Sequence, residues 1–222
     1  MDARRSSALE ALGVTAYVLR RGPTGAPVAQ AAAVPAAMNW NALAATVREC
    51  TLCGLCVTRT QTVFGTGDVR ARLMVIGEAP GADEDRQGEP FVGRAGQLLN
   101  SMLRAAGFER PQVYIANVLK CRPPNNRDPA TEETDRCLPY LLRQIELVNP
   151  AVILCLGRIA AQRLLERDET IARMRGRIHR LGNRPVVVTY HPAYLLRSPT
   201  EKRKSWEDLK LAMGVLANGD GA

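Results

Sequence analysis

Three polar residues stand directly after apolar runs, where the strands of a parallel sheet usually present their chemistry. Glu78 lies in the segment GEAPG (residues 77–81), whose glycines and proline suit a tight loop that brings backbone N–H groups close to a ligand. Asn117 offers a donor and an acceptor to the edge of a ring. His191 can donate a hydrogen bond to developing negative charge. Each feature alone also suits a turn or a structural polar group, so only their convergence would indicate a site.

The loop after residue 81 continues with acidic residues and one aromatic residue. Glu84 belongs to an acidic run at 83–85, and Phe91 follows a proline in the segment GEPFVG (88–93). An aromatic side chain in a loop can stack on a flat ring. It can equally act as a hydrophobic staple on the next helix. Both interpretations of Phe91 stay open on this pattern alone.

The six cysteines are candidate metal ligands. The N-terminus lacks the apolar stretch of about 7–15 residues that a secretory signal needs, so we expect a cytoplasmic protein. In a reducing compartment, cysteines are metal ligands, redox groups or buried apolar residues more often than disulfides. Local spacing alone favours Cys50, Cys53 and Cys56 with one distant partner as iron–sulfur ligands. Four thiolates would also suit zinc.

Alternating apolar and amphipathic segments predict the elements that position these residues. Short apolar runs predict four strands, at 73–76, 113–115, 151–156 and 185–189. Periodicity and capping residues predict helices from Asn39 or Asn41 to about residue 48, and at 93–106, 131–148, 157–165 and 203–216. This alternation predicts an α/β fold, a three-layer sandwich with a central, mainly parallel four-stranded sheet flanked by helices. The polar residues at the carboxyl ends of the strands are then expected to share one cleft.

The ends of the chain are predicted to differ from the domain between them. Residues 1–37 are rich in Ala and Pro and lack helical or strand periodicity, which indicates a poorly ordered extension. The alternative is a small module at 6–20, packed through Leu9, Leu12, Val14 and Leu19. Residues 38–217 are predicted to form the domain, and 218–222 a disordered tail.

Composition favours a soluble protein with a phosphate-bearing partner. The formal net charge is +8 and the sequence pI is about 9.5. Basic side chains that neutralise phosphates release counterions, which favours nucleic acid. Other basic proteins share these values, so charge alone does not identify the partner. No apolar run approaches the roughly 18 residues of a membrane span, so no membrane partner is expected.

Several motifs together resemble one known family. In order, they are GEAPG (77–81), PFVG (90–93) with GQLL (96–99), NVLKCRPP (117–124) and HPAYLL (191–196). They resemble the family 4 uracil-DNA glycosylases over about residues 47–213, which leaves the N-terminal extension outside the resemblance. The resemblance implies an enzyme that flips uracil out of double- or single-stranded DNA. It would hydrolyse the N-glycosidic bond and leave an abasic site, the first step of base excision repair.

The resemblance also implies roles for individual residues. Phe91 would stack on the flipped uracil, Asn117 would read its edge, and His191 would stabilise the departing anion. Glu78 and Glu84 would order water or support the loop, and Leu195 is predicted to enter the duplex where the base departs. The loop residues that would cradle uracil are Gly77, Ala79, Pro80 and Gly81. The predicted contacts to the DNA backbone are Arg197, Ser198, Lys202 and Arg203, with Thr200, Lys204, Arg122 and Arg127 nearby.

For the cysteines, the resemblance overrides local spacing. It implies that a [4Fe–4S] cluster is held by Cys50, Cys53, Cys121 and Cys137, with zinc as the alternative occupant. Cys56 would be an additional thiol, and Cys155 would belong to the core. The cluster would tie the N-terminal helix to the loop after Asn117.

Two rival interpretations remain. A superfamily variant that stays covalently attached to DNA would need a histidine between Asn117 and Cys137, and the sequence has none there; His179 lies beyond Cys137. A non-catalytic, metal-stabilised nucleic-acid-binding domain would not need Glu78, Asn117 or His191. We expect a monomer.

Overall fold

The structure is a computed structural model that describes residues 37–218. Apart from Ala37 and Asn218, the predicted N-terminal extension, its alternative module at 6–20 and the C-terminal tail lie outside the described residues. Among the helices within 37–218, none is long and apolar enough to cross a membrane.

Six strands form one sheet in the order β1-β3-β2-β4-β6-β5. The four inner strands are mutually parallel: β3 (Tyr114–Asn117), β2 (Leu73–Gly77), β4 (Val152–Leu156) and β6 (Arg184–Thr189). An antiparallel strand pairs at each edge: β1 (Thr66–Gly67) and β5 (Ile178–Leu181). The α/β fold is confirmed, but the predicted count of four strands is wrong because it omits both edges. β1 has only two residues, and β5 mixes apolar and basic residues, so neither shows an apolar run.

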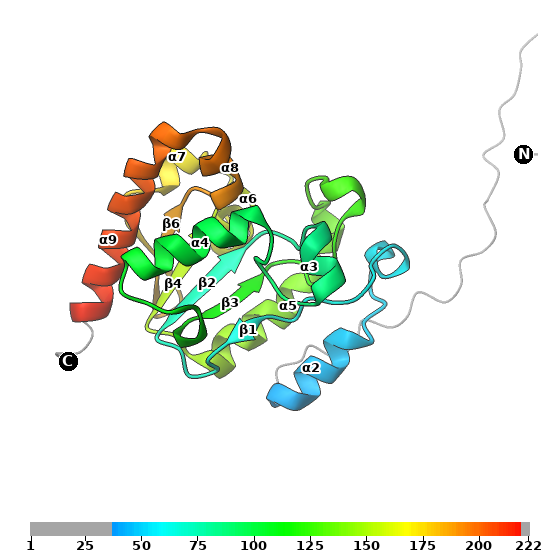
Figure 1. The fold of residues 1–222 in the computed structure, drawn as a ribbon. Coiled ribbons are helices and arrows are strands. Elements are labelled where there is room, and N and C mark those ends of the chain that lie inside the picture. Colours follow the sequence, from blue (N-terminus) through cyan, green and yellow to red (C-terminus); the bar gives the residue numbers. More distant parts are fainter. Residues whose placement is uncertain (1–36, 219–222) are drawn as a thin grey trace, which may run out of the picture. The chain divides into compact units, whose positions relative to one another are not determined.

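Helices cover both faces of the sheet (Figure 1). They are α2 (Trp40–Arg48), α3 (Ala82–Gln87), α4 (Arg94–Ala105), α5 (Thr131–Val148), α6 (Arg158–Leu165), α7 (Ile171–Met174), α8 (Pro192–Arg197) and α9 (Lys202–Asn218). Four short 3-10 helices lie between them: η2 (Gly54–Val57), η3 (Arg110–Gln112), η4 (Pro124–Asn126) and η5 (Pro199–Glu201). The Asn39 side chain, not Asn41, caps α2 by accepting from Ala42 N at 3.0 Å.

Alternation along the inner strands divides the core into two layers. Met74 and Ile76 of β2 face the side covered by α5, α6 and α7. Leu73 and Val75 of the same strand face the side covered by α4 and α9. Because parallel strands are buried on both faces, nearly every residue is apolar, which explains why these four strands were visible in the sequence.

A third apolar cluster lies beside the sheet. It joins Leu43 and Val47 of α2 to Leu119 and Cys121 of the segment after β3. Cys137 and Tyr140 of α5 also belong to the cluster. The segment after β3 therefore packs against α2, a helix more than 60 residues earlier in the chain. The same segment begins at Asn117, so this cluster borders the carboxyl end of the sheet.

Candidate active site

A cleft of about 490 Å³ opens at the carboxyl ends of the inner strands. Its walls come from the loops after β2, β3 and β6 and from α8. The predicted site residues in its lining are Glu78, Ala79, Pro80, Gly81, Glu84, Phe91, Asn117, His191 and Arg197. The structure thus brings together side chains that are more than 100 residues apart in sequence.

Gly77, the last residue of β2, forms the floor beneath two of these side chains. A Cβ atom at this position would lie 2.5 Å from the Phe91 ring and would also overlap the Asn117 carboxamide. Glycine therefore allows both side chains to approach the backbone closely. The Asn117 side-chain oxygen is buried, and among the described residues it has no hydrogen-bond partner. A buried acceptor without a partner is costly, so it is a candidate for pairing with a ligand.

Phe91 is buried in the cleft wall with a left-handed backbone, φ 54°. This conformation is uncommon for an aromatic residue and persists only where the surroundings enforce it. Arg110 supplies part of that enforcement, because its guanidinium donates to Pro90 O at 2.5 Å and to Asn100 Oδ1 at 3.0 Å. It also pairs with Glu89 at 3.3 Å.

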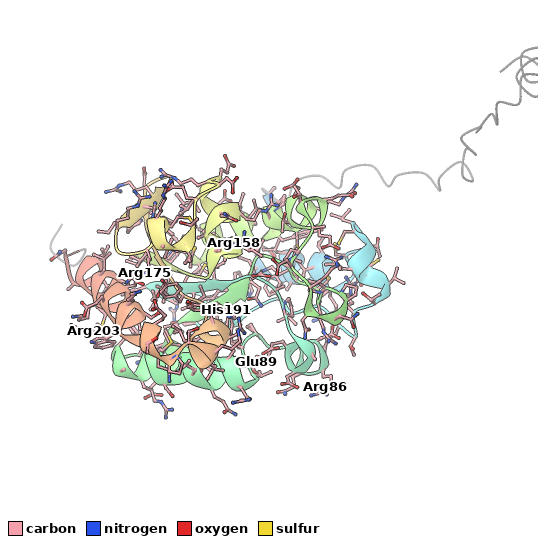
Figure 2. All side chains as sticks on the ribbon, turned by 90° about the horizontal axis from the view of Figure 1, so that it is seen from above. Arg86, Glu89, Arg158, Arg175, His191 and Arg203 are labelled. Carbon is pink, nitrogen blue, oxygen red and sulfur yellow. The ribbon has the colours of Figure 1, made fainter. Side chains whose placement is uncertain are left out.

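His191 precedes α8 and caps it. Its Nδ1 accepts a hydrogen bond from Ala193 N at 3.1 Å, which places the proton of the neutral ring on Nε2. Burial, with a smaller contribution from Arg197, lowers the pKa of His191 to about 4. At neutral pH the ring is therefore an uncharged hydrogen-bond donor. Figure 2 shows His191 between Arg158 and Glu89.

Glu84 links two loops of the cleft. One carboxylate oxygen accepts from Gly81 N at 3.1 Å, and the other accepts from Val92 N at 2.9 Å and Gly93 N at 3.1 Å. Both oxygens are thus occupied by backbone donors. This geometry favours loop support over water activation for Glu84.

Glu78 has a different environment, although it lines the same cleft. Burial and the nearby charge of Asp128 raise the pKa of Glu78 to about 7, and Arg158 opposes this shift. Its backbone oxygen accepts from Leu119 N at 3.0 Å, which fixes the loop after β2 against the segment after β3. Near neutral pH the side chain can therefore take up or release a proton.

The prediction that Leu195 enters the duplex is wrong. Leu195 is 1% exposed and lies on the inner side of α8, so its side chain is not available to enter the duplex in this structure. Tyr194 and Leu196 occupy the outer side, each 37% exposed. The motif HPAYLL alone does not show which side of α8 faces the core, so it could not distinguish Leu195 from Tyr194 or Leu196.

The predicted DNA-backbone residues are spread over more than one surface. Arg197 lines the cleft, whereas Lys202 lines a separate groove beside Trp206. Arg203 is exposed and lies to one side of His191 (Figure 2). Ser198 is partly buried and ends α8.

Sequence reasoning missed part of the cleft lining. Asn126 was not singled out, and it lines the cleft beside the predicted cation Arg127, which donates to Glu133 on α5. Asn125 and Asn126 both have φ 54°, and such an Asn pair is a turn signal that could have been noticed.

Comparison with known proteins agrees with this arrangement. The model of the uracil DNA glycosylase superfamily matches residues 64–210. A type-4 uracil-DNA glycosylase of Archaeoglobus fulgidus is 46% identical over 172 residues, which cover 74% of this chain and 86% of that protein. The type-4 enzyme of Thermotoga maritima is 46% identical over 174 residues, or 77% of this chain and 91% of that protein.

This chain belongs to the type-4 uracil-DNA glycosylase family. A third relative, the type-4 enzyme of Pyrobaculum aerophilum, is 43% identical over 176 residues. The aligned region covers 76% of this chain and 90% of that protein, so the similarity extends well beyond the cleft motifs.

In this type-4 family member, four cysteines line a second, smaller cavity. They are Cys50, Cys53, Cys121 and Cys137, whereas Cys56 is not part of that lining. Within residues 37–218, no group of three or more His, Cys, Asp or Glu side chains is arranged so that it could hold a metal ion.

Hydrogen-bond donors surround these sulfurs. Arg59 Nη1 lies 3.1 Å from the Cys121 sulfur, and Lys120 N lies 3.2 Å from that of Cys137. The Tyr140 hydroxyl lies 3.6 Å from Cys50. Such donors stabilise metal-bound thiolates. Burial raises the pKa of the Cys53 and Cys121 thiols, and it raises the pKa of Cys137 to about 12.

Proposed function

We propose that this protein removes uracil from DNA by hydrolysing the bond between uracil N1 and the deoxyribose C1′, leaving an abasic site. The unpaired Asn117 Oδ1 carries the proposal. Uracil presents an N3–H donor that this acceptor would bind, whereas cytosine presents an N3 lone pair at the same place. A buried acceptor would therefore select uracil over cytosine by leaving the wrong base unpaired.

We assign His191 to the leaving group. As the C1′–N1 bond breaks, its electron pair passes to the uracil ring, and Nε2–H of a neutral His191 donates to the oxygen that gains negative charge. Phe91 would support the face of the flipped ring. The backbone of residues 77–81 would complete the cradle.

Glu78 is our candidate for activating water. A carboxylate with a pKa near 7 can accept a proton from the water that adds to C1′. Glu84 is a positioning residue, since its oxygens are occupied by three backbone donors.

We propose that Cys50, Cys53, Cys121 and Cys137 hold a [4Fe–4S] cluster. When bound, the cluster would cross-link α2 to the segment after β3. The cavity and the donors around its sulfurs support this assignment. Anaerobically purified protein with about four irons and broad visible absorption would agree with it, whereas colourless protein with one zinc per chain would refute it.

The DNA would cross the mouth of the cleft, with Arg197 and the exposed cations Lys202 and Arg203 contacting phosphates. A DNA substrate would place the enzyme at the nucleoid in the cytoplasm. We propose that it acts as a monomer on both double- and single-stranded DNA.

The deciding experiment measures uracil release from U·G, U·A and single-stranded oligonucleotides. Alkali-sensitive abasic product from these substrates is the expected result. Absence of product from all three would refute the proposal. Denaturing electrophoresis of the same reactions would reveal a covalent adduct if the chemistry followed the variant mechanism instead.

A further inference from the structure

Lys120 is a buried lysine between the two cavities. It is 1% exposed, although a lysine is almost never fully buried without partners. Its ammonium donates to Asn117 O at 2.8 Å and to Gln144 Oε1 at 2.6 Å. The charged end of the side chain thus folds back onto the residue assigned to read uracil.

The partners of Lys120 are themselves fixed. Gln144 donates to Phe64 O at 2.9 Å and to the Tyr114 hydroxyl at 3.1 Å, so its oxygen is oriented toward the lysine. The backbone of Lys120 is held as well, because its N–H donates to the Cys137 sulfur and its carbonyl accepts from Val63 N at 2.7 Å.

The Asn117 carbonyl lies where the β-ladder ends. The neighbouring bonds, Val118 N to Gly77 O and Leu119 N to Glu78 O, continue the pairing between the two loops. Lys120 supplies a donor to the Asn117 carbonyl. Rotation of this peptide would turn the Asn117 carboxamide away from the cleft, so the lysine restrains the orientation of the reading group.

We propose that Lys120 is a positioning residue that fixes Asn117 for uracil recognition and couples the cysteine cavity to the cleft. This inference rests on the proposed function. It predicts that loss of the lysine ammonium weakens recognition of the base rather than binding of the DNA backbone.

The test compares Lys120→Met with the wild type in two binding measurements and one rate. The first duplex carries 2′-fluoro-2′-deoxyuridine, which resists cleavage, and the second carries a tetrahydrofuran abasic analogue. We expect Lys120→Met to weaken the first complex about fivefold, as for one lost hydrogen bond, and to leave the second within twofold. Single-turnover uracil release should slow by about 10–100-fold.

A Gln144 variant supplies a second test of the same contact. Gln144→Met removes the acceptor that anchors the lysine and should reproduce the defect. Arg143→Met removes a neighbouring cation of α5 that instead contacts Met38 and Glu146, and should behave as wild type. If Lys120→Met does not fold, the comparison of Gln144→Met with Arg143→Met tests the inference instead.

Two outcomes would overturn the inference. One is normal base recognition in folded Lys120→Met and Gln144→Met; the other is an equal loss on both DNA ligands. Absence of uracil release from the wild type would instead refute the proposed function.

A second, independent observation concerns Tyr194. Its side chain is 37% exposed and lines the cleft, and its ring lies 5.0 Å from that of Tyr190, tilted by 33°. Tyr190 is buried and lies beneath the Arg175 guanidinium, 5.7 Å from the ring centroid. Tyr194 is therefore an exposed aromatic with a firm support at the edge of the cleft.

We infer that Tyr194 stacks against the bases left behind when uracil leaves the duplex. Apolar or aromatic wedges stabilise an opened base step by replacing the lost stacking. Such a role matters most where a stable base pair must be broken, and least on a single strand. It also rests on the proposed function.

Single-turnover uracil release by Tyr194→Ala tests this role on three substrates. We expect about a tenfold loss on U·A duplex, a smaller loss on U·G and a change within twofold on single-stranded DNA. Tyr194→Phe should retain activity. Leu196→Ala is the matched control, because Leu196 is equally exposed but is not part of the cleft lining in the described structure.

Equal losses on all three substrates, or a duplex-specific defect in Leu196→Ala alone, would overturn the inference. If the wild type releases no uracil, the proposed function fails; if it does release uracil, these outcomes refute only the role of Tyr194.

Discussion

The rings of Phe91 and His191 lie 5.5 Å apart with an interplanar angle of 32°. They belong to loops after β2 and β6, which are separated in the sheet by β4. Gly157, which follows β4, has φ +93°, and a Cβ atom there would lie 3.1 Å from His191 Cβ. A glycine at the end of the middle strand therefore lets His191 approach the cleft from the neighbouring strand.

Asn117→Ala and His191→Ala should lower turnover far more than DNA affinity. Both side chains are assigned to the departing base, and loss of one such donor or acceptor costs about 100–1,000-fold in rate. Single-turnover rates and binding to abasic-analogue DNA measure the two effects. Parallel losses in rate and affinity would contradict the assigned roles.

Uracil release should rise with pH through about 7, because Glu78 would act as a carboxylate and its pKa is about 7. Glu78→Gln should be slow, without this rise. Single-turnover rates between about pH 5.5 and 8.5 provide the measurement. An unchanged pH profile in Glu78→Gln would exclude Glu78 as the titrating group.

The Glu78 carboxyl should also change the free energy of unfolding, which should fall as pH rises, whereas the rate of uracil release should rise. Its pKa is raised from 4.5 to about 7 in the folded state, so the folded protein binds more protons than the unfolded chain in this window. The wild type should therefore lose stability relative to Glu78→Gln as pH rises from about 4.5 to 7, by roughly 2–3 kcal/mol in all. Urea unfolding at pH 5 and pH 8 tests this difference.

Glu84→Gln should loosen both loops of the cleft. An amide has only one acceptor oxygen, so it cannot satisfy the donors of Gly81, Val92 and Gly93 together. We expect a loss of about 1–3 kcal/mol in the free energy of unfolding, together with slower uracil release. Asp83→Asn is the matched control, since Asp83 pairs with Arg86 at the surface. Equal behaviour of the two variants would contradict the loop-supporting role.

Cys50→Ser should lose the iron–sulfur absorption, whereas Cys56→Ser should keep it. Cys50 lines the cavity shared with Cys53, Cys121 and Cys137, and Cys56 does not. Iron and sulfide content per chain gives the measurement. Loss of the cluster in Cys56→Ser, with retention in Cys137→Ser, would favour the local C-x-x-C-x-x-C set instead.

The inner strands and the main cleft were predictable because their signals are local. Apolar runs buried on both faces marked β2, β3, β4 and β6, and Glu78, Asn117 and His191 each lie at or just after the end of one of these strands. The edge strand β5 was not predictable in this way, since Ile178 is 47% exposed and its pairing with β6 depends on tertiary structure. Local patterns likewise could not show that Leu195 faces inward or that Lys120 bonds Asn117.

Asp208→Ala should destabilise the fold strongly without removing a cleft residue. Asp208 is fully buried on α9 and accepts from Arg175 at 3.0 and 2.9 Å and from Gly176 N at 3.0 Å. Removing the carboxylate leaves a largely buried guanidinium without its counter-ion, although its bond to Lys204 O remains, and this costs about 3–5 kcal/mol. Glu207→Gln breaks only the exposed pair with Lys210 and should leave the free energy of unfolding nearly unchanged. Chemical denaturation distinguishes the two, and similar small effects would mean that the buried pair does not anchor α9.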